Sequence, residues 1–287
     1  LHKARSPYEL VERSEYRANR WCAEHFLTED SFREAFAAGF CGVKPYLNYA
    51  PSYIPAKEIR IYDFITPAQF ELMNELDAAL SARNLPTRIV FISYMDTAWP
   101  PLVERIKNSD RFSLLSAPIS RSYTESVPDS LEGVTYTPYV RNNLTLFPTV
   151  APYIKCAKDW QTTCRVPAML YEYHFWLHQY YDVSMLGLSE VINEDVRAYK
   201  RAGIDGIIED GSQRSFFPTG FAFYTYARTL YDTSLTIEEL AEEYFECAFG
   251  EEWKSFYSYL ERVGECFDFA YLEGERSKNS EFSAYYN

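Results

Sequence analysis

The stretch VPAMLYEYH, residues 166–174, decides the fold class, because it reads as a short apolar strand that ends in a carboxylate and an imidazole. Three other runs have the same apolar character, at residues 88–95, 112–119 and 204–209, and a weaker run spans residues 40–47. Continuous apolar runs of this length are typical of parallel strands that are buried on both faces. We therefore expect a parallel sheet.

Helix signals alternate with these strands. Thr66 opens a capping-box pattern with Pro67 as the first helical residue, which predicts a helix that runs to about residue 83. Thr236 repeats the pattern, and Gly250 and Gly203 are placed to end helices. Alternation of strands and helices predicts βαβ units.

We predict an α/β fold of TIM type, a (β/α) barrel. About five strands are found where a closed barrel needs eight, so either upstream sequence supplies the rest or strands lie within residues 49–64 and 120–147. Residues 1–66 are the predicted N-terminal helical and loop part of the barrel, 67–235 its core, and 236–287 C-terminal helices packed on it. A doubly wound sheet is the alternative, but no GxGxxG motif follows a strand, which argues against a Rossmann domain.

Charge and composition limit the partners. The chain has 41 acidic and 28 basic residues, a formal net charge of -13, and no basic cluster of the kind that nucleic-acid binding needs. No apolar run approaches the ~20 residues of a membrane-spanning helix. We expect no nucleic-acid partner, no membrane and no cofactor, and with no targeting signal the cytoplasm is slightly favoured. The chain begins at Leu1 like a cut through a larger protein, so the expected partner is a covalently attached upstream domain.

The carboxyl ends of parallel strands are where such folds bind ligands, and three of the predicted strands carry acidic residues there. These residues are Asp96, Glu172, Glu209 and Asp210. Neighbouring strands lie ~4.8 Å apart, so carboxylates at their ends fall ~5–10 Å apart, which suits glycoside hydrolysis. A buried charge is costly, so apolar strands rarely end in carboxylates without cause. Loop capping is the structural alternative.

Roles follow from this placement. We assign Glu172 as the general acid, because its apolar neighbours raise a carboxyl pKa, and Glu209 or Asp210 as its partner: base, nucleophile or positioning group. Asp96 is expected to bind a sugar hydroxyl and Trp99 to stack on a sugar ring. The full set of predicted substrate-binding residues is Tyr94, Asp96, Trp99, His174 and Arg214.

Strand alternation places Glu172 and His174 on one face and Tyr171 and Tyr173 on the other. If Glu172 faces the barrel axis, the two tyrosines pack against helices. His174 and His178 also have the i, i+4 spacing that can hold zinc on a helix. A third ligand is not obvious and HExxH is absent, so a metallohydrolase is an alternative and no metal is expected.

Two segments resemble an uncharacterised family of bacterial barrel domains. They are residues 94–101 with the strand at 112–119, and residues 202–211 with the aromatic helix that reaches residue 232. The resemblance covers roughly residues 67–250. The family occurs in large bacterial proteins beside a module similar to the N-terminal domain of alpha-glucuronidases, which implies a glycoside-hydrolase-like TIM barrel. Many members have a cysteine-rich turn that this chain does not reproduce, and no catalytic residue is carried over.

These observations predict a carbohydrate-active enzyme, glycoside-hydrolase-like, that acts on a glycan through paired carboxylates at barrel strand ends. A carbohydrate-binding barrel without catalysis and an interaction scaffold within a larger protein are the alternatives. A catalytic site predicts two carboxyl groups in one cleft, one of them with a perturbed pKa. A binding module predicts stacked aromatic rings without that pair, and a scaffold predicts a broad apolar patch.

Overall fold

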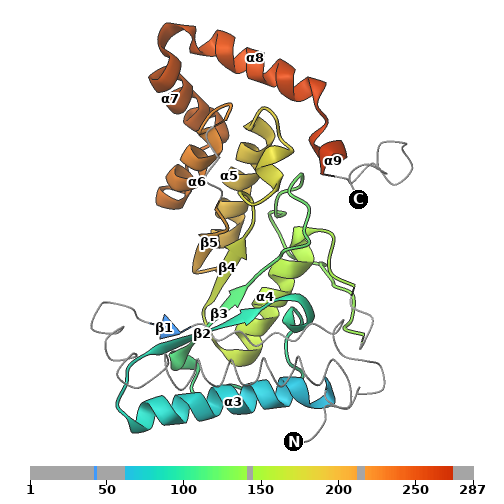
Figure 1. Ribbon diagram of the computed structural model, residues 1–287, viewed down its shortest axis with the longest axis vertical. Coiled ribbons are helices and arrows are strands. Elements are labelled where there is room, and N and C mark those ends of the chain that lie inside the picture. The colour runs from blue at the N-terminus through green and yellow to red at the C-terminus, as the bar shows by residue number, and fades with distance from the viewer. Residues whose placement is uncertain (1–41, 44–61, 141–144, 212–216, 274–287) are drawn as a thin grey trace, which may run out of the picture.

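The computed structural model describes residues 42–43, 62–140, 145–211 and 217–273. Five parallel strands form one sheet: β1 (Gly42–Val43), β2 (Arg88–Ser93), β3 (Phe112–Ser116), β4 (Ala168–Glu172) and β5 (Gly206–Glu209). Their order in the sheet is their order along the chain (Figure 1). The predicted α/β fold with a parallel sheet is confirmed, and each observed strand lies within a predicted run.

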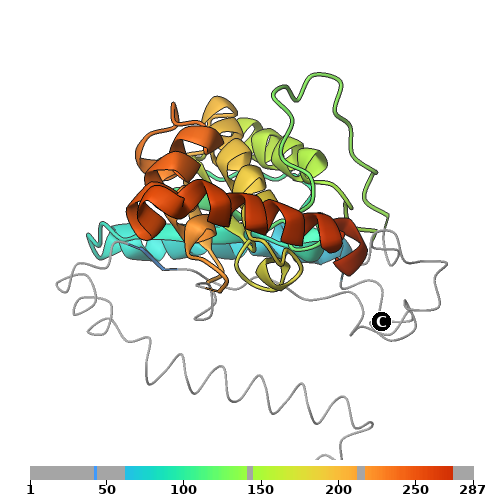
Figure 2. The same cartoon turned by 90° about the horizontal axis from the view of Figure 1, so that it is seen from above.

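Helices connect the strands and extend the chain beyond the sheet. The longer ones are α3 (Tyr62–Ala82), α4 (Val150–Cys164), α5 (Leu186–Arg201), α6 (Phe221–Tyr231), α7 (Ile237–Phe249) and α8 (Trp253–Cys266), followed by the short α9 (Phe269–Leu272). Single 3-10 turns are η3 (Met95–Thr97), η4 (Ser109–Arg111), η5 (His178–Tyr180) and η6 (Gly250–Glu252). Figures 1 and 2 show α7 and α8 stacked over the end of the molecule that lies farthest from α3.

The connecting helices share one face of the sheet. Phe70 of α3 stacks on Trp160 of α4 with ring centroids 6.0 Å apart, and Tyr199 of α5 belongs to the same hydrophobic cluster as Ile89 and Leu170 of the strands. Parallel strands in chain order, joined by right-handed crossovers, place their helices on one side. Barrels share this order, whereas the order reverses within a doubly wound sheet. Closure into a barrel stays a prediction.

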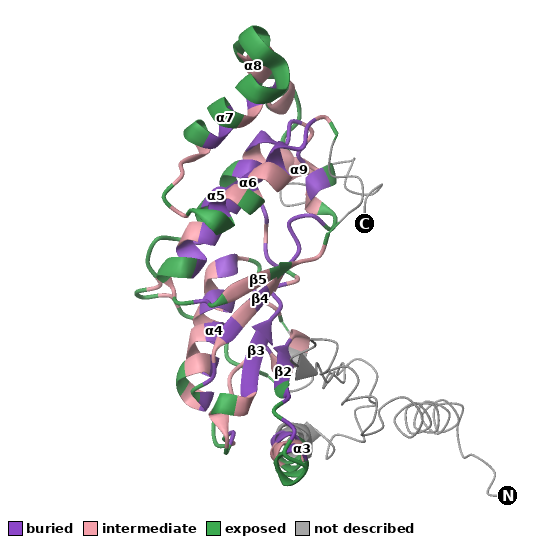
Figure 3. Cartoon of the chain, turned by 90° about the vertical axis from the view of Figure 1, so that its left-hand side faces the viewer, coloured by how far each residue is buried: buried purple, intermediate pink, exposed green. Residues whose placement is uncertain are grey.

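Side chains alternate between the helix-covered face and the opposite face. In β4, Leu170 and Glu172 are buried on the helix-covered face, whereas Met169 is half-buried on the other. Figure 3 shows β3 coloured as buried beside α4. A side chain built at Gly206 of β5 would meet Met169 at 3.7 Å, so Gly206 shares the opposite face. Glu209, three residues later, therefore lies on the helix-covered face with Glu172. Glu172 therefore lies on the helix-covered face, and Tyr171 lies on the opposite face, the one that a barrel would turn toward its axis.

The helix ends predicted at Thr236, Gly203 and Gly250 are confirmed, and one predicted helix start is wrong. Thr236 Oγ1 accepts a hydrogen bond from the Glu239 amide at 3.3 Å, and the Thr236 amide donates to the Glu239 carboxylate at 2.9 Å. Gly203 follows α5 with φ of 71°, a left-handed conformation that favours glycine. Helix α3 begins at Tyr62, before the cap predicted at Thr66.

No strand lies in the described part of residues 120–147, and most of residues 49–64 lies outside the described residues. The division into 1–66, 67–235 and 236–287 stays a prediction. None of the helices in the described ranges has the length and apolar character needed to cross a bilayer.

Candidate functional site

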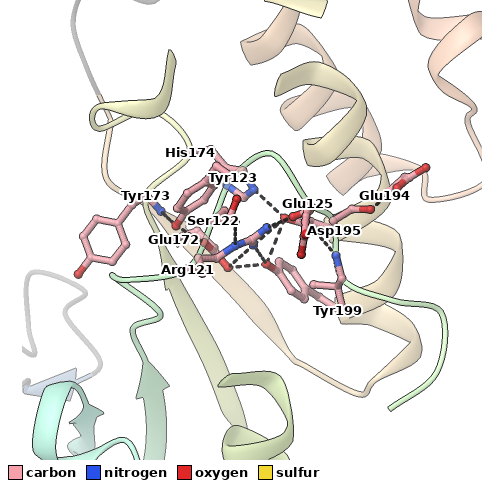
Figure 4. Close-up of polar contacts among 12 residues, drawn as sticks. Arg121, Ser122, Tyr123, Glu125, Glu172, Tyr173, His174, Glu194, Asp195 and Tyr199 are labelled. Atoms are coloured by element: carbon pink, nitrogen blue, oxygen red, sulfur yellow. Dashed lines mark hydrogen bonds and ion pairs between the residues drawn. The ribbon is translucent and has the colours of Figure 1, made fainter. Parts of the chain in front are cut away.

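A buried network of charged and polar side chains lies where β4 and β5 end against α5 (Figure 4). We call it the carboxyl-end network. Its side chains come from four places: the loop after β3, the end of β4 with the start of the loop that follows it, α5, and the end of β5. Its members are Arg121, Tyr123, Glu172, His174, Asp195, Tyr199 and Glu209.

Arg121 stands at the centre of the network and has no exposed side-chain surface. Its Nη1 donates to Asp195 Oδ2 at 2.7 Å and to Tyr199 Oη at 2.8 Å, and lies 3.4 Å from Glu172 Oε1. The other guanidinium N–H groups donate to carbonyl oxygens of its own loop. Burial alone would lower the pKa of Arg121, but the facing oxygens raise it well above its ordinary value.

Glu172 has both carboxylate oxygens engaged. Tyr123 Oη donates to Oε2 at 2.7 Å, and Tyr199 Oη donates to Oε1. Burial, reinforced by the nearby carboxylates, raises the pKa of both phenols well above the ordinary value, so they remain donors. Glu172 has no exposed surface and no oxygen available to a ligand, which differs from its expected role as general acid.

His174 joins two carboxylates. Its Nε2 lies 3.0 Å from Asp195 Oδ2 and its Nδ1 lies 2.7 Å from Glu209 Oε1. A neutral imidazole has one N–H, so only the doubly protonated ring can donate to both. Burial alone would lower the pKa of His174. The combined effect of Glu209 and Asp195 is larger, and it raises the pKa from 6.5 to about 10. Burial raises the pKa of Asp195, but Arg121 and the His174 bond give a net lowering.

The network holds one more carboxyl group than it holds cations. Three carboxyl groups, on Glu172, Asp195 and Glu209, face two cations, Arg121 and His174. Burial raises the pKa of Glu209, and the opposing effect of His174 does not cancel it. Within the described residues the buried Oε2 of Glu209 has no hydrogen-bond partner, whereas both oxygens of the other two carboxylates are bonded.

A second histidine–glutamate pair adjoins the network. The Tyr123 ring stacks on His178 at 3.9 Å and meets His174 edge-on at 5.0 Å. His178 Nδ1 is bonded to Glu273 Oε1, which also accepts from the Tyr123 amide at 3.3 Å. Each imidazole is thus held by its own glutamate. In the described part of the chain no group of three His, Cys, Asp or Glu side chains is arranged to hold a metal ion, so the zinc alternative gains no support.

Trp99 is occupied by contacts within the protein. Its indole N–H donates to the Thr137 carbonyl at 2.7 Å, and its ring packs edge-on against Tyr139 and Phe147 at 5.4 and 5.1 Å. These contacts make it a packing residue and not the expected sugar platform. Trp176, in the loop after β4, is 42% exposed and presents a more accessible ring.

Of the other predicted site residues, the structure describes the side chains of Tyr94 and Asp210 but not those of Asp96 and Arg214. Tyr94 is half-buried beside the aromatic cluster that includes Tyr123. Asp210 is half-buried just beyond β5, on the opposite face from the residue before it, and its amide donates to the Glu172 carbonyl at 2.8 Å. Asp96 lies in η3 with its side chain outside the description, and Arg214 lies outside the described residues altogether.

Sequence reasoning missed the residues that hold the site together. Asp195 and Tyr199 lie on the buried stripe of α5, with Leu188 and Ile192. An aspartate within an apolar helical stripe is a detectable signal, because it requires a buried partner. Arg121 lies in an irregular loop and gave no such signal.

A surface hollow of about 210 Å³ lies at the opposite edge of the sheet, at the amino ends of β2 and β3. Arg111, on its wall, is tied to Asp77 at 2.6 Å and to the carbonyls of Leu85 and Thr87. These bonds explain the arginine structurally. The hollow is remote from the carboxyl-end network, and fold geometry favours the carboxyl edge for ligands.

Comparisons with protein-family models, curated proteins and solved structures found no match for this chain. The resemblance to bacterial barrel domains stays a prediction.

Proposed function

We propose that this chain is a carbohydrate-binding domain, part of the wall of a glycoside-hydrolase-like (β/α) barrel, with its ligand at the carboxyl ends of β4 and β5. The observation that carries the proposal is the unpartnered Oε2 of Glu209 in a network whose other carboxylate oxygens are all bonded. A sugar hydroxyl both donates and accepts, so it can pair with this carboxyl group in either protonation state. Asp210 adds a second carboxylate at the same strand end.

Aromatic rings around this edge support the same ligand class. The ring centroids of Tyr171 and Tyr173 lie 5.2 Å apart, and those of Tyr173 and Trp176 lie 5.7 Å apart. Trp176 and Tyr180 are 42% and 49% exposed in the loop that follows β4. Such rings combine an apolar face with a polar group, and the C–H face of a sugar packs on them while its hydroxyls reach the carboxylates.

Binding is better supported than catalysis through the predicted pair. Glu172 is enclosed by Arg121, Tyr123 and Tyr199, and it shares the helix-covered face with Glu209. A carboxylate in this position fixes the network and does not meet a ligand.

The test is a binding screen against soluble xylo-, cello-, chito- and malto-oligosaccharides by calorimetry. Glu209→Gln and Asp210→Asn should each weaken binding of the best ligand about tenfold or more, since a hydrogen bond to a charged group contributes ~1.5–3 kcal/mol. The matched control is Asp110→Asn, an exposed aspartate at the amino edge of the sheet. Equal affinities for the Asp110 and Asp210 variants, or no binding by the unmodified chain, would contradict the proposal.

Glycoside hydrolysis is the second candidate, and the raised pKa of Glu209 favours it. A carboxyl group with a raised pKa and an oxygen that no protein group occupies is suited to act as general acid. Asp210 would be the second carboxyl group. Glu209→Gln should then lose turnover of unactivated glycosides by about 10²–10⁴-fold and retain more turnover of dinitrophenyl glycosides, whose leaving group needs no proton. Binding without turnover by the unmodified chain excludes this candidate and leaves the first intact.

A further inference from the structure

The Glu273–His178 pair repeats the arrangement of the Glu209–His174 pair. In both, the Nδ1 atom of a histidine in the loop after β4 bonds the Oε1 atom of a glutamate from a distant element. In both, the glutamate side chain is only 7% exposed. In both, Oε2 is buried and has no hydrogen-bond partner within the described residues.

The histidines of both pairs contact the ring of Tyr123. The tyrosine ring is 5.0 Å from the His174 ring and 3.9 Å from the His178 ring, measured between centroids. Its amide donates to Glu273, and its hydroxyl donates to Glu172. The two unsatisfied oxygens therefore belong to one continuous assembly at the carboxyl edge.

Contacts that hold the fold together account for only one of the two oxygens of the Glu273 carboxylate, Oε1. Oε1 alone ties the end of α9 to the loops that carry Tyr123 and His178. A buried carboxylate oxygen without a donor costs free energy that a glutamine or an apolar residue would avoid. The free oxygen is explained when a ligand supplies the donor.

We propose that Glu273, oriented by His178, is a second ligand-binding carboxylate that accepts a hydrogen bond from a hydroxyl of a neighbouring sugar unit. The inference rests on the proposed function and extends it: the ligand is an oligosaccharide of at least two units, one at Glu209 and one at Glu273. Both oxygens are buried, so side chains at the carboxyl edge have to move aside on binding, and such side-chain changes are common at recognition surfaces. Trp176 and Tyr180, exposed in the loop that carries both histidines, are placed to stack on these units.

The experiment compares monosaccharide, disaccharide and trisaccharide forms of the best-binding glycan by calorimetry, with the full chain. Glu273→Gln keeps the size of the side chain and an oxygen for His178 but removes the charge. Glu265→Gln, at an exposed position of α8, is the matched control. We expect Glu273→Gln to weaken disaccharide binding about tenfold or more and to leave monosaccharide binding unchanged, with the Glu265 variant like the unmodified chain.

Other outcomes separate the two proposals. Unchanged disaccharide affinity in Glu273→Gln, or equal losses for monosaccharide and disaccharide, overturns the second site and leaves the proposed function standing. Failure of the unmodified chain to bind any glycan overturns the proposed function and this extension with it. If Glu273→Gln does not fold, Glu273→Asp, which keeps the charge but is one methylene shorter, must show the same selective loss for the disaccharide.

Discussion

Replacing Arg121 with methionine should destabilise the chain far more than any surface substitution. Methionine is similar in length to arginine but has no charge and no hydrogen-bond donor. Arg121→Met therefore removes the cation that faces Asp195 at 2.7 Å and Glu172 at 3.4 Å. It also removes the donor to Tyr199 and the contact of the guanidinium with the Tyr123 ring at 4.4 Å. Two carboxylates then remain buried with less compensation.

The magnitude follows from this burial. Removing one partner of a fully buried ion pair costs ~3–5 kcal/mol, because an uncompensated charge remains. Domains are stable by only ~5–15 kcal/mol, and in a chain of this size each kcal/mol lowers the thermal midpoint by roughly 2–4 °C. We expect a fall of roughly 6–20 °C.

The assay is equilibrium unfolding in urea together with thermal unfolding at neutral pH. Arg201→Met is the control, since Arg201 forms a surface pair with Asp129, which is 93% exposed, and such pairs contribute ~0–1 kcal/mol. The pKa of Asp195 is lowered in the folded chain, so its stabilisation is present above the ordinary aspartate pKa of about 3.9 and is lost as the pH falls. The difference between Arg121→Met and the unmodified chain should therefore narrow in acid. A loss of less than ~1 kcal/mol at neutral pH, like that of the control, would refute the reasoning.

Two further predictions concern pH and helix capping. Because the pKa of His174 is raised from 6.5 to about 10, its stabilisation is complete below about pH 6.5 and is lost as the pH rises through about 10; the free energy of unfolding, measured in urea, should fall over this range. His174→Asn should flatten that dependence, and equal slopes for the two proteins would show that the ring is not held protonated. Thr236→Ala should cost about 1 kcal/mol, because it removes the acceptor for the Glu239 amide at the start of α7. An unchanged urea midpoint would contradict the role of this cap.

The strands could be predicted because their signal is local. The apolar run at residues 166–173 contains β4 (Ala168–Glu172), and the run at 204–209 contains β5 (Gly206–Glu209). Their pairing in chain order follows from the helices between them. Local pattern was less reliable for α3, where a cap-like sequence at Thr66 lies inside the helix. Capping residues can satisfy the free backbone groups of a helix start, but their presence does not force the helix to begin there.

The orientation of the site could not be predicted. Alternation shows that Glu172 and His174 share a face but not which face it is. The sequence gives no in-and-out signal for strands buried on both sides, because apolar residues occupy both sets of positions. The hydrogen bond from Tyr199 of α5 to Glu172, and the bridge that Arg121 makes between Glu172 and Asp195 of α5, settle that this face is the helix-covered one.

The carboxyl-end network also bears on whether the chain is a scaffold. A scaffold gains little from buried ion pairs, since well-packed apolar side chains in the same positions are often as stabilising or more so. It gains less from a network that leaves carboxylate oxygens of Glu209 and Glu273 without donors. A recognition site does gain from them. Acceptors already fixed by His174 and His178 do not have to be ordered when a ligand hydroxyl arrives, so less of the interaction energy is lost to ordering. The features that make this assembly costly for stability are the ones that the proposed binding would use.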